Sequence, residues 1–273
     1  MMDEEFEILK KVIIEKIGFF PERYKERPLM RRIAVRMRHI KINSYLEYAR
    51  LLERNIKEQD LLHKTLTINV SKFFRNYVTF RRIKEAVLPQ LLREKEKRGG
   101  IIKIWCGGCA TGEECYTIAM LLDEFLREKK SSVVFSVIGT DIDEDSLNTA
   151  QIGCYENKAF DETPEYFLKK YFKKDEKFCV LKKVKEKVKF VKLDIEEENM
   201  YLKELDLILF RNVLIYMKRT FQEKILLKIY NRLNERGFLV LGKVETLVGE
   251  TKLLFTIVDS KERIFRKCRI LKR

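Results

Sequence analysis

The chain has 273 residues, 45% of them hydrophobic, and its 57 Lys and Arg against 42 Asp and Glu give a net charge of +15. The length fits one domain of ordinary size or two small ones, and the charge suggests an anionic partner, whether nucleic acid, anionic lipid or an acidic protein surface. No segment approaches the roughly 18 apolar residues of a membrane span, and no basic and then apolar leader opens the chain. We therefore expect a cytoplasmic protein that does not insert into membranes and whose six cysteines are reduced.

Residues 1 to about 65 have a helical pattern, with apolar residues recurring every three or four positions from Phe6 to Ile17. The stretch 29–42 contains no acidic residue and predicts a helix with one strongly basic side. A run of charge is usually a solvated face, but the absence of acids favours a surface that docks an acidic partner. The arginines concerned are Arg31, Arg32, Arg36 and Arg38.

A connecting region of unusual composition follows at residues 69–76. Phe73 and Phe74 are most simply interpreted as core residues, whereas Arg75 is either an ordinary surface residue or a functional one. Residues 93–100 are rich in charge and end in two glycines, so they predict a linker into the next strand.

An apolar run at residues 101–106 predicts a buried parallel strand, and residues 115–126 have the apolar spacing of a helix. The turn between them contains Gly107 and Gly108, which would let the backbone approach a ligand closely. Strand, turn and helix predict the first βα unit of a doubly wound sheet, in which ligands bind beyond the carboxyl ends of the strands.

The residues around this turn indicate which ligand is bound. Glu113 and Glu114 open the helix, where they would repel a pyrophosphate and favour a cation, unless they only complement the helix dipole. The glycine spacing also misses the dinucleotide pattern G-x-G-x-x-G. Asp141 ends the next predicted strand, 133–140, where nucleoside-binding sheets hold ribose hydroxyls. The combination predicts S-adenosylmethionine, a nucleoside that carries a sulfonium and an ammonium group.

Residues 152–190 interrupt the alternation of helix and strand. Within them, 178–181 and 188–191 predict short strands joined by a Lys/Glu turn, and we expect a small antiparallel insertion beside the main sheet. The predicted strands that follow offer further polar residues at the carboxyl edge of the sheet. These candidate ligand contacts are Asp194, Arg211, Asn212 and Tyr216, the last of which is equally consistent with packing.

Residues 254–258 and 263–267 predict a closing antiparallel pair of strands. Cys106 and Cys109 have the spacing of a redox or zinc pair, but they lie in the glycine turn and no second C-x-x-C occurs. We interpret them as small residues in a tight turn and predict no metal site.

Five motifs occur in order over nearly the whole chain: NVSKFFR from Asn69, CGGCATGEECY from Cys106, TDID from Thr140, RNVLIY from Arg211 and LGKVE from Leu241. Together they resemble the chemotaxis receptor methyltransferases, which transfer a methyl group from S-adenosylmethionine to glutamates of chemoreceptors. The resemblance departs at Lys243-Val244, where His-Ser is common in the family, and at Ser71, where threonine is usual.

The resemblance implies an α/β fold, the Rossmann-like doubly wound sheet of S-adenosylmethionine-dependent methyltransferases, with an N-terminal all-α domain and a small inserted antiparallel β subdomain. Residues 1–90 are expected to form the helical, receptor-docking domain and linker helix. Residues 91–273 are expected to form the catalytic domain, with the inserted β subdomain at 152–190.

The resemblance also implies roles for individual residues. Arg75 and Tyr216 would lie nearest the transferring methyl as catalytic residues, and the four arginines of 29–42 would dock on the acidic helical bundle of a receptor. A monomer recruited to receptor arrays is expected. The cofactor-binding residues implied are Asn69, Ser71, Arg75, Gly107, Glu114, Asp141, Asp194, Ile195, Arg211 and Asn212.

Members of this family that bind a receptor tail peptide usually carry a glycine-containing loop in the insertion. This chain has no glycine between Tyr155 and Phe190, and its predicted turn at 182–187 is rich in lysine. Lysines along a short edge strand discourage strand addition, so we predict an enzyme without a tail-peptide tether.

Two other functions are consistent with parts of the sequence. An RNA or small-molecule methyltransferase on the same fold would suit the net charge, and a non-catalytic module could use the same site to sense the cofactor. The sequence lacks the aromatic platform with interleaved arginines of single-strand readers, so we expect no nucleic-acid partner. The presence of Arg75, Asn212 and Tyr216 argues against a non-catalytic module.

Overall fold

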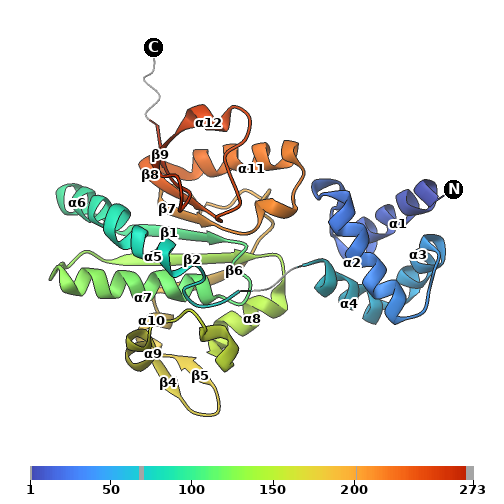
Figure 1. The fold of residues 1–273 in the computed structure, drawn as a ribbon, viewed down its shortest axis with the longest axis horizontal. Helices are drawn as coiled ribbons and strands as arrows, with labels where there is room; N and C mark the ends of the chain where they lie inside the picture. Colours follow the sequence, from blue (N-terminus) through green and yellow to red (C-terminus); the bar gives the residue numbers. More distant parts are fainter. Residues whose placement is uncertain (1, 68–70, 201, 269–273) are drawn as a thin grey trace. The chain divides into compact units, whose positions relative to one another are not determined.

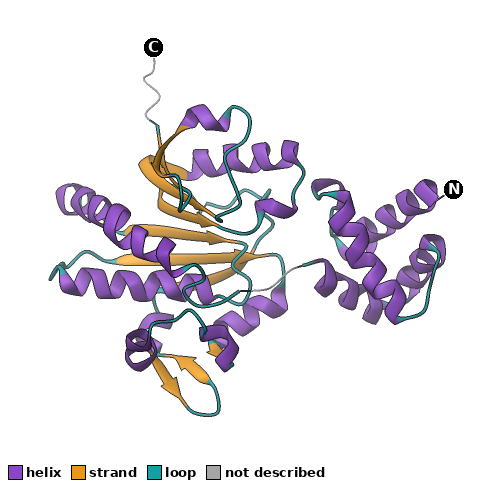
Figure 2. Cartoon of the chain, in the orientation of Figure 1, coloured by secondary structure: helices purple, strands orange, loops and turns teal. Residues whose placement is uncertain are grey.

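A computed structural model describes residues 2–67, 71–200 and 202–268. These residues form two compact units (Figures 1 and 2). The first unit comprises the described residues of Met1–Ile68 and Tyr216–Gln222, and the second those of Asn69–Ile215 and Glu223–Arg273. In the described ranges, no helix combines the length and the apolar character needed to cross a bilayer.

The first unit is helical because its apolar residues recur at helical spacing and share one core. Leu9, Ile33 and Leu62 are among the side chains that this core buries completely. Ser44 and Asn55 each accept a backbone N–H at the start of a helix, which sets where the third and fourth helices begin. The helices are α1 (Met2–Ile17), η1 (Pro21–Arg23), α2 (Glu26–His39), α3 (Tyr45–Arg54) and α4 (Ile56–Leu66).

The second unit is built on a sheet with the strand order β6-β2-β1-β7-β8-β10-β9, as far as the structure describes it. The first five strands are parallel, and β10 and β9 form the predicted antiparallel pair. Helices α7 and α8 pack on β2 and β6, and α6 packs on β1 (Figure 1). The strands are β1 (Ile102–Gly107), β2 (Phe135–Asp141), β6 (Val188–Lys192), β7 (Leu205–Phe210), β8 (Leu233–Leu241), β9 (Phe255–Asp259) and β10 (Ile264–Lys267).

The helices of this unit connect the strands as a doubly wound sheet requires. They are α5 (Tyr77–Arg82), η2 (Ile83–Val87), α6 (Leu88–Arg98), α7 (Glu113–Glu128), α8 (Glu144–Ile152) and α12 (Thr251–Leu254), together with η4 (Leu214–Tyr216) up to Ile215 and α11 (Arg219–Arg232) from Glu223 onward. The linker predicted at 93–100 is wrong for most of its length, because α6 continues to Arg98. Lys95 pairs with the buried Asp206 at 2.8 Å, which holds this charged end of the helix against the sheet.

The strand order reverses between β1 and β7. From β1 the chain runs outward through β2 to β6, and it then returns to the other side of β1 as β7 and β8. Ligands of open α/β sheets bind at this switch point, beyond the carboxyl ends of the strands. Gly107 ends β1 and Phe210 ends β7, so the loops that follow these residues form the expected ligand edge.

The insertion differs from its prediction. The three-stranded sheet has the order β3-β5-β4, whereas the predicted partner strand at 188–191 is β6, the edge of the main sheet, parallel to β2. The predicted Lys/Glu turn is a short helix, α10, that carries the chain back to the main sheet. The elements are β3 (Cys154–Tyr155), η3 (Asn157–Phe160), α9 (Glu165–Tyr171), β4 (Phe172–Lys174), β5 (Phe178–Val180) and α10 (Lys182–Lys185).

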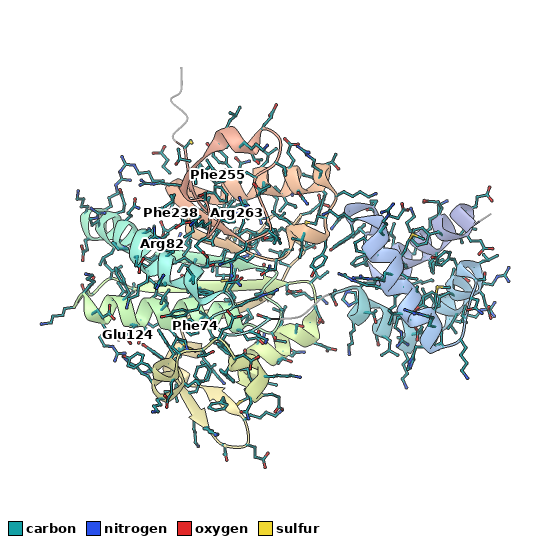
Figure 3. The ribbon with its side chains drawn as sticks, in the orientation of Figure 1. Phe74, Arg82, Glu124, Phe238, Phe255 and Arg263 are labelled. Carbon is teal, nitrogen blue, oxygen red and sulfur yellow. A yellow bond between two sulfur atoms is a disulfide. The ribbon has the colours of Figure 1, made fainter. Side chains whose placement is uncertain are left out.

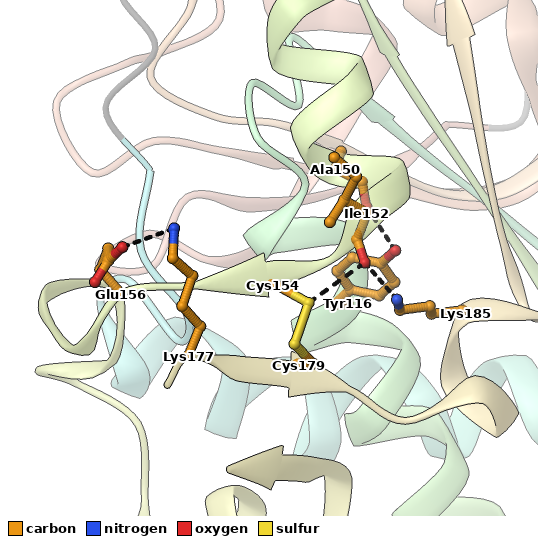
Figure 4. The surroundings of a disulfide bond; sticks show 8 residues. All are labelled: Tyr116, Ala150, Ile152, Cys154, Glu156, Lys177, Cys179 and Lys185. Carbon is orange, nitrogen blue, oxygen red and sulfur yellow. Dashed lines mark hydrogen bonds and ion pairs between the residues drawn. A yellow bond between two sulfur atoms is a disulfide. The ribbon is translucent and has the colours of Figure 1, made fainter. Parts of the chain in front are cut away.

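A disulfide joins Cys154 to Cys179 (Figure 4). The expectation of reduced cysteines is therefore wrong for this pair. The bond can form because the register of the sheet places the two cysteines directly opposite each other on β3 and β5. Lys185 donates to the carbonyl of Ile152 beside the bridge, and Lys177 pairs with Glu156 at 2.8 Å. The disulfide thus closes a loop that contains most of the insertion.

Candidate cofactor site

The glycine turn after β1 is shaped by close packing. A Cβ on Gly107 would lie 2.8 Å from the ring of Phe210, and one on Gly108 would lie 2.6 Å from Val213. Sequence reasoning assigned both glycines to the approach of a ligand. The structure adds a requirement inside the protein, because the loops after β1 and β7 meet here without space for side chains on the turn.

Asp141 is fixed by backbone groups at the ends of two adjacent strands. Its carboxylate accepts the N–H of Ala110 at 2.8 Å and that of Asp143 at 3.1 Å. Burial raises the pKa of Asp141. A carboxylate has about four acceptor positions, so these bonds orient Asp141 and leave capacity for ribose hydroxyls. Asp143 accepts the N–H of Asp145 at the start of α8, as an N-cap residue does.

The two acids at the start of α7 have different environments. Glu113 is buried, accepts the hydroxyl of Thr111 at 2.8 Å and is hydrogen bonded to Ser71. Burial raises the pKa of Glu113. Ser71, a predicted cofactor contact, therefore has a partner within the protein. Sequence reasoning missed that Glu113 anchors the Ser71 segment, because only the tertiary fold brings the two together.

Glu114 pairs with Arg211, whose Nη1 lies 2.6 Å from the carboxylate. The side chain of Arg211 is only 1% exposed and that of Glu114 16%. Arg211 Nη2 also donates to the backbone oxygen of Arg75 at 2.8 Å. One guanidinium therefore connects the end of β7, the start of α7 and the Arg75 segment. This edge of the sheet carries three carboxyl groups, those of Glu113, Glu114 and Asp141, and the guanidinium of Arg211. This excess of acidic groups suits a ligand that carries a positive charge.

The insertion supports the segment that carries Arg75. Phe73 donates its N–H to Ala159 at 2.9 Å, and the ring of Phe73 stacks on that of Phe160 with centroids 4.8 Å apart. Two ion or hydrogen-bond contacts add to this, Lys72 to Asp161 and the N–H of Asn76 to Glu162, each at 2.6 Å.

The prediction that Phe73 and Phe74 are core residues is confirmed, since both are fully buried. Phe74 extends into the interior of the second unit, where its ring lies 4.6 Å from that of Phe167 on α9 (Figure 3). The aromatic contacts therefore continue the support that the insertion gives to the backbone at Arg75.

Other predicted site residues lie along the same edge. Asp194 follows β6 and accepts the N–H of Glu196 at 2.9 Å, and the next carbonyl, of Ile195, accepts a hydrogen bond from Arg232. Asn212 follows Arg211 and has a left-handed backbone with φ of 63°. Asn69 lies outside the described residues. Tyr216 belongs to the first unit, so its proximity to Arg75 stays a prediction.

The basic helix α2 separates into two kinds of arginine. Arg36 donates to both oxygens of the buried Glu58, at 3.0 and 2.6 Å, and Arg32 donates to the carbonyl of Leu66 and lies over the ring of Tyr216. These two arginines bind within the first unit. Of the four predicted docking arginines, Arg31 and Arg38 are exposed and available to a partner.

The thiols near the turn are buried. Burial raises the pKa of Cys106, Cys109 and Cys115, which keeps them protonated at neutral pH and poorly nucleophilic. Over the described ranges, no set of three or more His, Cys, Asp or Glu side chains is arranged to hold a metal ion.

Comparison with known proteins identifies the domains. Residues 69–264 match the family model of the CheR methyltransferase SAM binding domain. The second unit is thus the methyl-transferring, S-adenosylmethionine-binding domain that its fold and site indicated. Residues 4–67 match the CheR methyltransferase all-alpha domain. The chain belongs to the CheR methyltransferase family, which confirms the predicted fold class, resemblance and cofactor.

Three chemotaxis protein methyltransferases match over almost their full length. A chemotaxis protein methyltransferase of Borreliella burgdorferi is 30% identical over 257 residues, covering 92% of this chain and 90% of the relative. One from Listeria monocytogenes is 27% identical, covering 91% and 92%. A third, chemotaxis protein methyltransferase 2 of Pseudomonas aeruginosa, is 27% identical, covering 93% and 90%.

Replacing Asp141 tests the ribose assignment. Asp141→Ala is expected to weaken S-adenosylmethionine binding by about 1–3 kcal/mol, because it leaves buried polar partners unmet. Because the pKa of Asp141 is raised, affinity should fall with decreasing pH at values above the ordinary pKa of about 3.9, as the carboxylate gains a proton. Calorimetry measures both effects.

Asp143→Ala is the matched control, since it removes a nearby carboxylate that caps α8. It should lower stability and leave the affinity unchanged. An unaltered Kd in folded Asp141→Ala protein would contradict the ribose assignment.

Proposed function

We propose that this protein transfers a methyl group from S-adenosylmethionine to glutamate side chains of chemoreceptors, forming methyl esters, and that it acts in the cytoplasm at receptor arrays. The relatives named chemotaxis protein methyltransferase support the proposal. The observation that carries it is the arrangement of Asp141, Glu114 and Arg211 around the edge that also holds Arg75.

The residues present suit the cofactor. Asp141 would hold the ribose hydroxyls, and the acidic start of α7 would favour the positive charge near the reacting carbon. Asn212 and Asp194 would contact the remaining parts of the nucleoside. When bound, S-adenosylmethionine supplies a methyl group on a sulfonium.

A glutamate substrate needs no general base. Its ordinary pKa is near 4.3, so the nucleophile is already ionised at neutral pH, and no proton has to be removed. What remains is alignment of the carboxylate oxygen with the methyl group, which is chiefly a matter of positioning. We assign that role to Arg75, whose guanidinium can orient a carboxylate through two hydrogen bonds.

Arg75 is suited to this role by its backbone. Arg211 binds its carbonyl, and the insertion holds the residues on either side. A side chain on a fixed backbone loses less freedom when it binds a substrate. The contact should still be moderate, because the attacking oxygen loses charge in the transition state and tight ground-state binding would slow transfer.

A labelled-methyl assay tests the proposal. The purified protein is incubated with methyl-labelled S-adenosylmethionine and either receptor-containing membranes or total RNA. We expect label in the receptor, released as volatile methanol by mild alkali, as a carboxylate methyl ester requires. Label in RNA, or label on protein that resists alkali, would refute it.

We also propose that Arg31 and Arg38 dock on the acidic receptor bundle. Both are exposed on α2, in a stretch without acids. The double variant Arg31→Glu/Arg38→Glu should raise the KM for receptor about three- to tenfold at low salt, since each exposed ion pair is worth about 0.2–1 kcal/mol and reversal adds repulsion. Cofactor affinity should be unchanged.

The matched control for the docking test is Arg50→Glu/Arg54→Glu, which makes the same charge change on exposed positions of α3. It should leave the KM close to that of the wild type. If both double variants raise the KM equally, the effect is one of net charge, and α2 is no specific docking surface.

We still propose that this enzyme has no tail-peptide tether, but the structural reason differs from the one predicted from the sequence. The lysine-rich segment 182–187 is not a hairpin turn, but the edge strand β4 carries exposed Lys173 and Lys174, and its turn to β5 contains no glycine. Removing the receptor's C-terminal tail should therefore leave the methylation rate within about twofold, roughly 0.4 kcal/mol in the barrier. A tenfold fall, or micromolar binding of the isolated tail, would overturn this proposal.

A further inference from the structure

Glu245 is a buried carboxylate at the ligand edge to which sequence reasoning gave no role. It lies in the loop after β8 and is only 3% exposed. Its Oε2 accepts the N–H of Gly242 at 2.6 Å and that of Asn212 at 2.9 Å, and its Oε1 accepts the N–H of Ile215 at 3.2 Å. The carboxylate therefore links the loops that follow the neighbouring strands β7 and β8.

These partners are all backbone amides. Burying a carboxylate is costly unless hydrogen bonds replace water, and several N–H donors can do so without a cation. Burial nevertheless raises the pKa of Glu245 above its ordinary value. A leucine of similar size would leave these N–H donors without an acceptor, so the carboxylate has a structural consequence for the loops that it binds.

That consequence concerns the backbone of Asn212. Asn212 has a left-handed conformation, with φ of 63°, and the bond from its N–H to Glu245 holds it there. The preceding residue, Arg211, reaches Glu114 and the Arg75 backbone. The packing is tight, since a Cβ on Gly242 would lie 2.7 Å from Glu245 Oε2 and 2.9 Å from the Asn212 nitrogen.

We propose that Glu245 is a positioning residue for cofactor binding, which acts by fixing the loop of Arg211 and Asn212 and does not touch the cofactor. The inference rests on the proposed placement of the cofactor against Asn212. It concerns affinity for S-adenosylmethionine alone, so it is separable from the identity of the methyl acceptor.

The test compares two conservative changes, one at a residue that binds the loop after β7 and one at the amino end of β7. Glu245→Gln keeps the size of the side chain but turns an NH2 group toward backbone donors. Asp206→Asn is the matched control, because Asp206 is also buried, at 6% exposed, and accepts the N–H of Lys103 at 2.8 Å at the amino end of the strand.

Calorimetry should show the Kd for S-adenosylmethionine raised at least tenfold in Glu245→Gln and changed by less than twofold in Asp206→Asn. Thermal unfolding should show both variants destabilised, which separates positioning from stability. A Kd within twofold of the wild type in Glu245→Gln, or equal rises in both variants, would overturn the proposal.

A second variant covers the case in which Glu245→Gln does not fold. Gly242→Ala retains the carboxylate but forces a Cβ against Glu245 Oε2 and the Asn212 nitrogen. It should also raise the Kd at least tenfold, because it displaces the same loop. An unchanged Kd in folded Gly242→Ala protein would equally refute the role of this linkage. If Asp141→Ala also binds normally, the placement of the cofactor fails, and the acceptor assay still tests the proposed function.

Discussion

The buried guanidinium of Arg211 is the interaction on which the ligand edge depends. It pairs with Glu114 at the start of α7 and binds the carbonyl of Arg75, so three segments far apart in sequence share one cation. Removing one member of a buried ion pair typically costs about 3–5 kcal/mol, because the other charge is left without water or partner. This geometry makes Arg211 primarily a connecting residue, whereas the sequence alone suggested a ligand contact.

The insertion supports the same segment, the one that carries Arg75. Its aromatic residues and two acids hold the backbone around Arg75, and the disulfide closes the chain between Cys154 and Cys179 around most of them. Functional side chains on loops need a rigid support, and here the insertion beside the main sheet provides it. The insertion therefore contributes to the site, whether or not it also binds a receptor tail.

The basic residues of the chain have two different roles, since some bind partners inside the protein and others are exposed on its surface. Of the four arginines at 29–42, Arg36 and Arg32 bind inside the first unit, and Arg31 and Arg38 are exposed. A buried arginine with a carboxylate partner specifies helix packing, while an exposed one acts at longer range and is screened by salt. A count of basic residues therefore overstates the surface that an acidic partner would meet.

Local sequence patterns predicted the strands of the main sheet, the helix after the glycine turn, the burial of Phe73 and Phe74, and the acids at the carboxyl edge of the sheet. These features depend on local periodicity and on turn residues, so a short stretch of neighbouring residues is enough to predict them. These acids predicted the cofactor, and the order of motifs added the family.

Three features became clear only from the folded chain: which sheet β6 joins, the pairing of Cys154 with Cys179, and the hydrogen bond from the loop after β7 to Glu245. Each of these depends on register or on contacts between distant segments. The bond from Arg211 to the Arg75 carbonyl spans 136 residues, and no local pattern encodes such a pairing. The folded chain sets it, because burial leaves each polar group only the partners that packing brings within reach.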